Sequence, residues 1–361
     1  MAADSSNDQD YLQEFPIVLS ASRLLQPVSE TPNAMTVIDR KMIDASGFRS
    51  LPDVFKLVPG MYVSYYGTQA IVSYHGSLSQ DAQGMQVLID GRSVYLPPAN
   101  TVDWALLPIT LDDVERIEVV RGPAAASYGE NSVHGVINII TRDAEAVDGT
   151  TVSNTRGNKG INDALVHFGK HGETLDYRMT VGYTADNGYD NLSIPPNNIP
   201  ITQGQASDLI NNTNDNNQAR LMNYRASYHP NSTDDFDVQL GFNHDVMGVG
   251  FLDSHGGFNP FHNMISYSNT QQLGWLHRTD NASEISVRYY HIQLDTDEDY
   301  QVSGFPVSRS IKSGRNELEF QHILQTSPTN RLVYGAGYRQ DQVSSQIYTT
   351  LIPPGVFLDV K

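Results

Sequence analysis

The chain has 361 residues, carries 41 acidic against 23 basic side chains for a formal net charge of −18, and contains no cysteine. This length exceeds an average domain and predicts two of them, while the acidic balance argues against a nucleic-acid partner that needs basic patches. The absence of cysteine excludes disulfides, thiolate metal sites and cysteine nucleophiles within these residues.

The N-terminal segment is acidic and polar before it turns apolar. Its first ten residues, MAADSSNDQD, have neither a positively charged region nor an apolar core, so they predict no signal peptide. Ile17, Val18 and Leu19 follow and are strand formers that could add a strand to the edge of a partner's sheet. From these residues alone, an ordinary first strand or a frayed terminus is the simpler interpretation.

The next part of the chain alternates short apolar clusters with helix signals, as in a small α+β domain. Asp39 can cap a helix over residues 40–45 that ends at Gly47, and Ser50 can cap a second helix over residues 51–58. Six short apolar segments predict strands at residues 35–38, 60–64, 71–74, 85–89, 117–120 and 136–141. We expect a mixed sheet with helices packed on it.

Beyond Asp148 apolar and polar side chains alternate with a period of two, as in strands with one apolar face. In one such strand, Leu175, Tyr177, Met179, Val181 and Tyr183 share a face, and Asp176, Arg178, Thr180 and Gly182 share the other. About nine strands are expected, near residues 150–155, 163–169, 174–184, 218–228, 235–247, 266–278, 284–295, 313–325 and 331–346.

The connectors between these strands alternate in length. Short turns alternate with three longer polar connectors at residues 185–217, 248–265 and 296–312. This alternation is typical of outer-membrane β-barrels, which have short periplasmic turns and longer extracellular loops. A soluble β-sandwich also has period-two strands, so the strand pattern alone does not separate the two folds.

Seven sequence blocks, which occur in a fixed order from about Thr36 to Arg142, identify a family resemblance. They read TVIDRKMIDASG, LPDVFKLVPGMYVS, VSYHG, QVLIDGRSV, VDWALLP, VERIEVVRGP and YGENSVHGVINIITR. Together they resemble the plug domain of TonB-dependent outer-membrane receptors. The resemblance implies an α+β plug domain followed by an antiparallel transmembrane β-barrel, located in a Gram-negative type of outer membrane and surrounded by its lipid.

The resemblance divides the chain into three parts: a flexible N-terminus at 1–34, a plug domain at 35–143 and a partial barrel at 149–361. Plugged transporters of this kind close with about 22 strands, and the chain supplies about nine. An open sheet of long strands would leave edges that a bilayer does not tolerate. We therefore expect a truncated chain, a split gene product or a fragment, from which the signal peptide is absent.

The resemblance also implies functional residues. Pro16, Ile17, Val18, Leu19, Ser20 and Ala21 resemble the TonB box, which would engage a TonB-type energy-transducing protein. The aromatic residues among the candidate ligand contacts could stack their rings on a flat ligand. The candidates are Tyr62, Tyr65, Tyr66, Gln69, Tyr74, His75, Phe258 and His262. His75 stands where family members often have arginine. A structural motif of the plug is expected at Arg121, Gly122, Pro123, Tyr128, Gly129 and Gly135.

Two groups of charged residues each have two interpretations. Glu115, Arg116, Arg121 and Arg142 could pair between plug and barrel wall, or form a solvated charged face. Asp295, Asp297, Glu298 and Asp299 lie in a predicted loop and offer oxygen ligands of the kind calcium accepts, but they lack the spacing of a calcium-binding loop. A solvated acidic run is the preferred interpretation, and no metal site is predicted.

The sequence contains no nucleophile elbow, phosphate-binding loop or zinc-binding helix motif, so we expect neither an enzyme nor a cofactor. The resemblance to TonB-dependent receptors implies TonB-dependent uptake of a scarce solute across the outer membrane, and an iron–siderophore complex is the expected cargo. The alternatives are a haem or cobalamin receptor, or a ligand-binding or relic fragment of such a receptor that does not transport.

Overall fold

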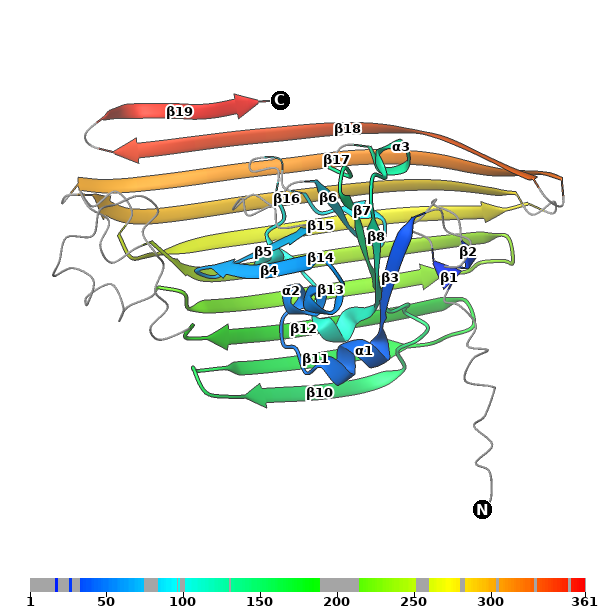
Figure 1. Ribbon diagram of the computed structural model, residues 1–361, viewed down its shortest axis with the longest axis horizontal. Coiled ribbons are helices and arrows are strands. Elements are labelled where there is room, and N and C mark those ends of the chain that lie inside the picture. Colours follow the sequence, from blue (N-terminus) through cyan, green and yellow to red (C-terminus); the bar gives the residue numbers. More distant parts are fainter. Residues whose placement is uncertain are drawn as a thin grey trace, which may run out of the picture.

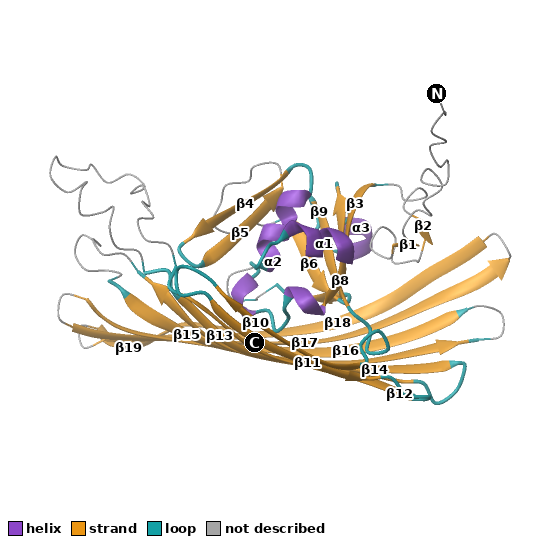
Figure 2. Ribbon diagram, turned by 90° about the horizontal axis from the view of Figure 1, so that it is seen from below, coloured by secondary structure: helices purple, strands orange, loops and turns teal. Residues whose placement is uncertain are grey.

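The computed structural model describes residues 17–18, 26–27, 33–74, 84–95, 97, 101–129, 131–188, 214–250, 260–279, 283–302, 305–327, 330–349 and 352–360. Two parts make up most of it: a small α+β unit from β3 to β9, called the plug here, and a large sheet from β10 to β19, called the barrel sheet. Figure 1 shows the plug in front of the barrel sheet, and Figure 2 shows the barrel sheet curving, with the plug on its concave side.

The plug contains short strands and short helices. Its elements are β3 (Ala34–Asp39), α1 (Arg40–Ser46), α2 (Leu51–Val54), η3 (Phe55–Leu57), β4 (Met61–Tyr66), β5 (Gln69–Tyr74), β6 (Met85–Ile89), β7 (Arg92–Ser93), η4 (Trp104–Leu106), η5 (Leu111–Asp113), β8 (Val114–Arg121), α3 (Ala125–Tyr128) and β9 (Gly135–Thr141). Ahead of it, β1 (Ile17–Val18) pairs with β2 (Gln26–Pro27).

The plug sheet has the strand order β3-β8-β9-β6-β7, in which β6 and β9 are parallel and the other pairs are antiparallel. The predicted mixed sheet is therefore confirmed, but the strands predicted at residues 60–64 and 71–74 lie outside it and pair with each other as β4 and β5. A core of buried apolar side chains, including Ile38, Phe55, Val114, Ile117 and Ile139, lies between this sheet, the helices and a separate β4–β5 hairpin. Its burial supplies the main favourable free energy for folding of the plug.

The first predicted helix begins and ends as expected. The Asp39 carboxylate accepts a hydrogen bond from the Met42 amide at 2.8 Å, and Gly47 ends the helix in the left-handed conformation. The second helix is shorter than predicted, because α2 changes into the 3₁₀ turn η3 after four residues. Among the described residues, no helix is long and apolar enough to cross a membrane.

The barrel sheet is an antiparallel meander in which each strand pairs with its neighbours in sequence. Its strands are β10 (Gly149–Arg156), β11 (Asn162–Lys170), β12 (Leu175–Asp186), β13 (Asn217–Tyr228), β14 (Asp234–Val249), β15 (His262–Arg278), β16 (Glu284–Val302), β17 (Phe305–Ser327), β18 (Asn330–Thr349) and β19 (Ile352–Val360). All nine predicted strands are present, and β19 is a tenth.

Burial on the barrel sheet is the reverse of that on a soluble sheet. On β12, Met179 and Val181 are 36% and 45% exposed, whereas Arg178 and Thr180 are 3% and 2% exposed. The same exposed face continues with apolar side chains on the following strands, among them Met222, Leu240, Phe242, Leu273, Leu318, Phe320 and Tyr338. The polar face therefore lies toward the plug and the apolar face points away from it.

One expectation about the connectors is wrong. Residues 296–312 do not form a long loop, because β16 and β17 extend through most of this range and pair as far as Val302 and Phe305. The acidic run therefore lies on β16, where Asp295 is opposite Lys312 in the register. Glu298 pairs with Arg309 at 3.4 Å. Opposite charges across the two strands allow an acidic segment to remain in a sheet.

Candidate ligand hairpin and plug–barrel interface

The β4–β5 hairpin carries most of the candidate ligand residues. Tyr62 and Tyr65 are 47% and 37% exposed, and Gln69 is exposed as well. In both ribbon views the hairpin points toward the end of the barrel sheet where β12 ends and β13 begins. The backbone of Tyr66 belongs to the same hairpin. A tyrosine-bearing hairpin at this end can contact a solute that approaches from that side.

One face of the hairpin is fixed to the plug core. Met61, Val63 and Tyr74 pack against the buried apolar cluster, so Tyr74 supports the hairpin rather than offering a free ring. Gly60 precedes β4 at a φ of +84°, and a Cβ there would lie 2.8 Å from the Tyr74 ring. This close approach requires glycine. The exposed tyrosines therefore project from a hairpin with a well-packed base.

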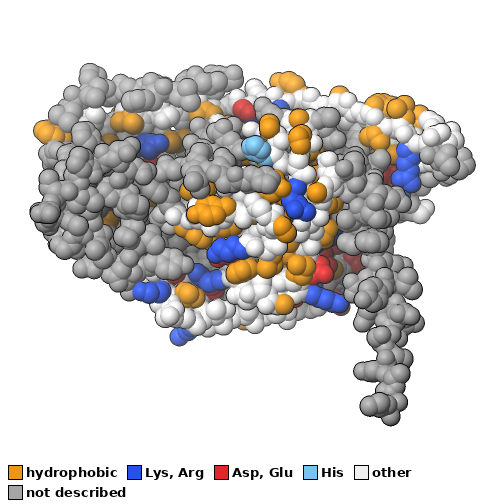
Figure 3. All heavy atoms as spheres, in the orientation of Figure 1, with side chains coloured by type: hydrophobic (Ala, Val, Ile, Leu, Met, Phe, Trp, Pro, Cys, Tyr) orange, Lys and Arg blue, Asp and Glu red, His pale blue; other side chains and the backbone are white. Residues whose placement is uncertain are grey.

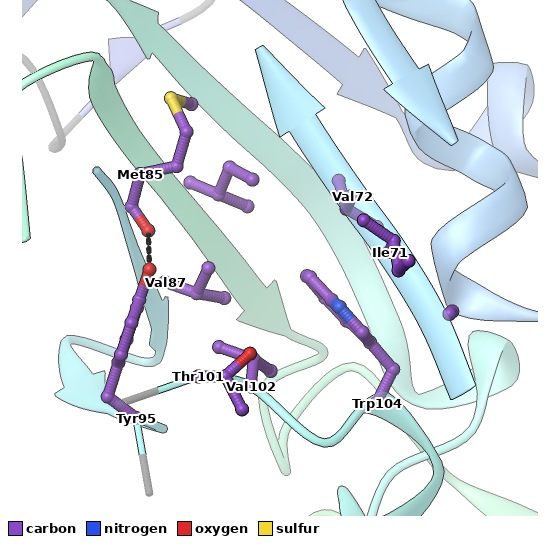
Figure 4. A pocket seen from close by; sticks show the side chains of 10 residues that line it. Ile71, Val72, Met85, Val87, Tyr95, Thr101, Val102 and Trp104 are labelled. Carbon is purple, nitrogen blue, oxygen red and sulfur yellow. Dashed lines mark hydrogen bonds between the residues drawn. The ribbon is translucent and has the colours of Figure 1, made fainter. Parts of the chain in front are cut away.

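A narrow crevice lies between β5, β6 and the segment around Trp104 (Figure 4). Its volume is about 10 Å³, and the Tyr95 hydroxyl donates a 2.6 Å hydrogen bond to the Met85 carbonyl at one side. Burial raises the pKa of Tyr95 above its ordinary value, so the hydroxyl stays protonated. The crevice is too small for a cargo and belongs to the packing of the hairpin base. Figure 3 shows hydrophobic side chains interspersed with Lys and Arg over the visible face of the plug.

His262 is the described candidate that lies on the barrel sheet. Its Nδ1 is 2.7 Å from the Pro260 carbonyl oxygen and its Nε2 is 3.2 Å from the Glu298 carboxylate. The ring also stacks on Tyr300 at 4.5 Å. With a side chain only 4% exposed, His262 is already occupied by protein partners. His75 and Phe258, the other two candidates, lie outside the described residues.

The plug is attached to the barrel sheet by buried charges and hydrogen bonds. Arg178 on β12 donates to the Asp113 carboxylate at 3.1 Å and to the Arg142 carbonyl at 2.8 Å. Thr180, on the same strand, donates to Asp113 at 2.5 Å. Because Arg178 and Asp113 are 3% and 2% exposed, this pair is shielded from water. It holds the turn before β8 against β12.

Further contacts continue around the barrel sheet. Arg225 on β13 pairs with Asp143 at 2.9 Å, just after the plug sheet ends. Asn243 on β14 donates to the Ala105 carbonyl at 2.9 Å, and Ser268 on β15 donates to the Leu106 carbonyl at 2.8 Å. These side chains satisfy backbone carbonyls of η4 that would otherwise be buried without partners.

Two further contacts attach the plug to β11 and β12. Asp112 lies 3.4 Å from His167, and this interaction holds the pKa of Asp112 below its usual range. Arg49 forms a bidentate pair with Asp163 at 2.6 and 2.7 Å and reaches Asp186 at 2.8 Å. Hydrogen bonding to Asp163 is the largest contribution that raises the pKa of Arg49 above its usual range.

Of the four residues expected to pair between plug and barrel wall, Glu115, Arg116 and Arg142 pair inside the plug instead. Arg116 contacts the fully buried Glu118 at 2.9 Å on its own strand, and Arg142 lies 3.9 Å from Glu115. Side chains two apart on one strand share a face, which explains the first pair. The expected link between the two parts exists, but Arg49, Asp113, Arg178 and Arg225 form it. The sequence offers no local motif for these four residues.

The expected structural motif surrounds the β8–β9 crossover. Arg121 ends β8, Gly122 and Pro123 follow it, Tyr128 ends α3, and Gly135 begins β9. Tyr128 packs on a second small apolar cluster. Gly122, Gly129 and Gly135 all have positive φ, and a Cβ on Gly135 would lie 2.1 Å from the Val120 carbonyl oxygen. Placement in tight backbone agrees with a structural role, which stays a prediction.

Of the TonB-box segment, Ile17 and Val18 are described. They form β1 and pair with Pro27 and Gln26 of β2. The remaining predicted members, Pro16 and Leu19 to Ala21, lie outside the described residues.

Among the side chains that the structure describes, no group of three or more His, Cys, Asp or Glu is placed to hold a metal ion.

Comparisons with known proteins agree with this arrangement. A family model described as the TonB-dependent receptor plug domain matches residues 27–136. The vitamin B12 transporter BtuB of Vibrio cholerae serotype O1 is 29% identical over 193 residues, which cover 53% of this chain and 31% of the transporter. BtuB of Vibrio vulnificus is 30% identical over 177 residues, covering 48% and 28%.

Solved structures share the fold over most of this chain. The ferric yersiniabactin uptake receptor FyuA from Yersinia pestis has a TM-score of 0.69 at 16% identity and covers 93% of this chain and 51% of its own. The ferric citrate transporter FecA has a TM-score of 0.63, also at 16% identity, with 90% and 50% covered. The chain thus spans less than a third of the length of these B12 transporters and about half of the two solved receptors. With its seven ordered blocks, its matched plug and this shared fold, the chain carries the plug domain of TonB-dependent receptors followed by part of an antiparallel barrel of the same fold.

Proposed function

We propose that this chain serves in TonB-dependent uptake of a scarce solute across an outer membrane of the Gram-negative type. The observation that carries the proposal is the position of the plug on the polar face of a sheet whose opposite face is apolar and exposed. An apolar outer face suits lipid, and a polar inner face suits a lumen that the plug fills. The named relatives are transporters and receptors, which agrees with a function other than catalysis.

The positions of the tyrosine hairpin and of β1 indicate a direction for transport. The tyrosine hairpin lies toward the end where β12 gives way to the long connector, and β1 lies toward the opposite end, in both ribbon views. Long connectors face outward in outer-membrane barrels. A solute would therefore meet Tyr62 and Tyr65 first, while Val18 would face the periplasm. There the extended segment would add a strand to a TonB-type partner.

An iron–siderophore complex is the proposed cargo, and cobalamin is the second candidate. Receptors for ferric chelates are among the proteins with the same fold, which supports the first. The curated relatives at 29–30% identity carry the name vitamin B12 transporter, which supports the second. The exposed tyrosine rings suit either a catecholate or a macrocycle, because both offer flat surfaces for stacking.

The test uses the full reading frame that contains this chain, produced in cells that lack other receptors for the probes. A heat-shifted band in the outer-membrane fraction would support a closed barrel. Uptake of radiolabelled ferric siderophores is then compared with uptake of radiolabelled cyanocobalamin. A protein that stays soluble, or that takes up neither probe, would overturn the proposal.

The same cells test the TonB box with a matched pair of variants. Val18→Pro should abolish uptake and leave surface binding of the probe unchanged, because proline removes a backbone donor that strand addition needs. Ser5→Pro, placed earlier in the polar leader, should leave uptake unchanged. Equal uptake by Val18→Pro and the parent protein would contradict the assignment.

A further inference from the structure

We propose that Arg49 and Ser50 couple the tyrosine hairpin to the attachment of the plug on the barrel sheet. This inference rests on the proposed function in one respect, namely that the hairpin contacts a solute. Its structural basis is independent, because two neighbouring residues bind two different parts of the molecule. Ser50 contacts the hairpin, and Arg49 contacts β11 and β12.

The hairpin end of the junction is a small hydrogen-bonded group. The Tyr65 hydroxyl lies 3.1 Å from the Ser50 hydroxyl, which donates to the Asp53 carboxylate at 2.7 Å. Lys56 donates to the other Asp53 oxygen at 2.6 Å. Burial raises the pKa of Asp53, but hydrogen bonds from Lys56, Ser50 and Tyr65 outweigh it and leave the pKa lowered. The carboxylate therefore stays charged and anchors both hydroxyls.

Tyr65 can serve this group and a solute at the same time. Its hydroxyl is held at the beginning of α2, while the residue as a whole remains 37% exposed. A flat ligand that stacks on the ring would tilt it, and the hydroxyl would leave Ser50. Tyr62 on the same strand is 47% exposed and, among the described residues, makes no such hydrogen bond, so it provides a natural control.

The barrel end of the junction is the Arg49 guanidinium. Besides its pairs with Asp163 and Asp186, it donates to the Ala185 carbonyl at 3.1 Å. Asp186 is the last residue of β12, at the root of a long connector. Arg49 therefore ties the plug to the strand end that lies beside the hairpin. The bidentate contact depends on the exact orientation of the guanidinium plane.

The strength of this attachment suits a contact that must be released. The side chains of Arg49 and Asp186 are 37% and 25% exposed, so water competes for this pair, although Asp163 is only 10% exposed. Arg178 in the neighbouring attachment is 3% exposed. A partly exposed ion pair contributes little to stability, whereas breaking a buried ion pair has a much larger free-energy cost. Because Ser50 is the next residue along the chain, its displacement would move the Arg49 backbone and weaken the bidentate pair. The Arg178 attachment would remain.

The experiment measures opening of the plug without any cargo. The 361 residues contain no cysteine, so Ala219→Cys introduces a single thiol among them. Ala219 is 5% exposed on the inner face of β13, next to Thr184 of β12. The rate at which a membrane-impermeant maleimide labels this thiol in outer-membrane preparations reports opening at the Arg49 attachment. Retention of the heat-shifted band shows that each variant has assembled.

Tyr65→Phe keeps the ring but removes the hydroxyl, and it should raise the labelling rate at least 3-fold. Tyr62→Phe should leave the rate within 1.5-fold of the parent protein. Arg49→Gln should also raise the rate, and adding Tyr65→Phe to it should cause no further increase, because coupled residues are not additive. If Arg49→Gln does not assemble, Asp186→Asn replaces it.

Two results would overturn the inference: equal rates for Tyr65→Phe and Tyr62→Phe, or effects of Tyr65→Phe and Arg49→Gln that simply multiply. Neither depends on transport. A protein that shows the coupling but takes up no ferric siderophore or cyanocobalamin would contradict the proposed function and leave the junction supported.

Discussion

Arg178 of the barrel sheet and Asp113 of the plug form a buried ion pair, with Nη1 3.1 Å from Oδ1. Each charge has further partners, since Asn223 accepts from Arg178 at 2.9 Å and Thr110 donates to Asp113 through its amide at 2.8 Å. Buried charges are tolerated when their hydrogen-bonding capacity is filled in this way. The pair specifies how the plug sits on β12.

Arg178→Gln should therefore weaken plug attachment strongly. The substitution leaves the Asp113 charge buried without its cationic partner, which costs on the order of 3–5 kcal/mol. Because the 361 residues contain two tryptophans, Trp104 in η4 and Trp275 on β15, urea titration of the purified receptor in a Trp275→Phe background, followed by the fluorescence of Trp104, measures the loss. Asp44→Asn is the matched control, because Asp44 pairs with Arg40 but is 64% exposed. That change should cost about 0–1 kcal/mol, and equal costs for the two variants would contradict the prediction.

Much of the fold could be predicted because its signals are local. The Asp39 cap and the Gly47 stop depend on residues within one or two turns, so they can be seen in the sequence. Alternation on β12 and its neighbours is equally local, and it predicted both strands and faces. The length of α2 could not be predicted in the same way, since tertiary packing of Phe55 determines where the helix tightens.

The plug–barrel contacts could not be predicted because they depend on long-range register. Arg49 reaches Asp163 over 114 positions, and no spacing rule links two residues so far apart. The prediction of a loop around Asp295 was wrong for a related reason. Read alone they resemble a polar loop, and only pairing with Lys312 on β17 shows that they lie in a strand. The structure around these charged residues is thus determined by partners that lie far away in the sequence.

The outward face of the barrel sheet can be tested with two adjacent small residues. Ala336 lies opposite the outward-facing Phe320 in the register, and Gly337 points to the other side of the same strand. Ala336→Arg places a charge toward lipid and should cost about 2–4 kcal/mol near the bilayer centre. Gly337→Arg places it in the lumen and should assemble normally. The heat-shifted fraction in outer membranes compares the two, and equal yields would argue against a lipid-facing apolar side.

Asp103 makes plug stability depend on pH. It caps η4 by accepting from the Ala105 amide at 3.1 Å, and burial raises its pKa to about 6. An acid with a raised pKa contributes stability below its unfolded pKa of about 4, and this is lost as the pH rises through about 6. The loss should be on the order of 1–3 kcal/mol. Asp103→Asn keeps a capping oxygen but does not titrate.

Urea midpoints measured by Trp104 fluorescence in the same Trp275→Phe background at pH 4, 5, 6, 7 and 8 test this prediction. The parent protein should lose stability between pH 4 and 6 relative to Asp103→Asn, and the two curves should run parallel above pH 7. Asp44→Asn serves again as the exposed control and should follow the parent protein at every pH. A constant difference between parent and Asp103→Asn across the range would show that Asp103 does not titrate in this window.

Gly135 provides the sharpest test of the predicted structural motif. Its φ is +150°, and an added Cβ would lie 2.1 Å from the Val120 carbonyl oxygen, so β9 would have to move away from β8. Gly135→Ala should destabilise the plug by at least about 1–3 kcal/mol, the usual cost of overpacking. Gly47→Ala is the control, since Gly47 also has positive φ but no atom within 4 Å of the added Cβ. That change should cost only the backbone term, about 1 kcal/mol. If both variants unfold at the same urea concentration, the clash at β8 does not explain the glycine, and the motif would need a different role.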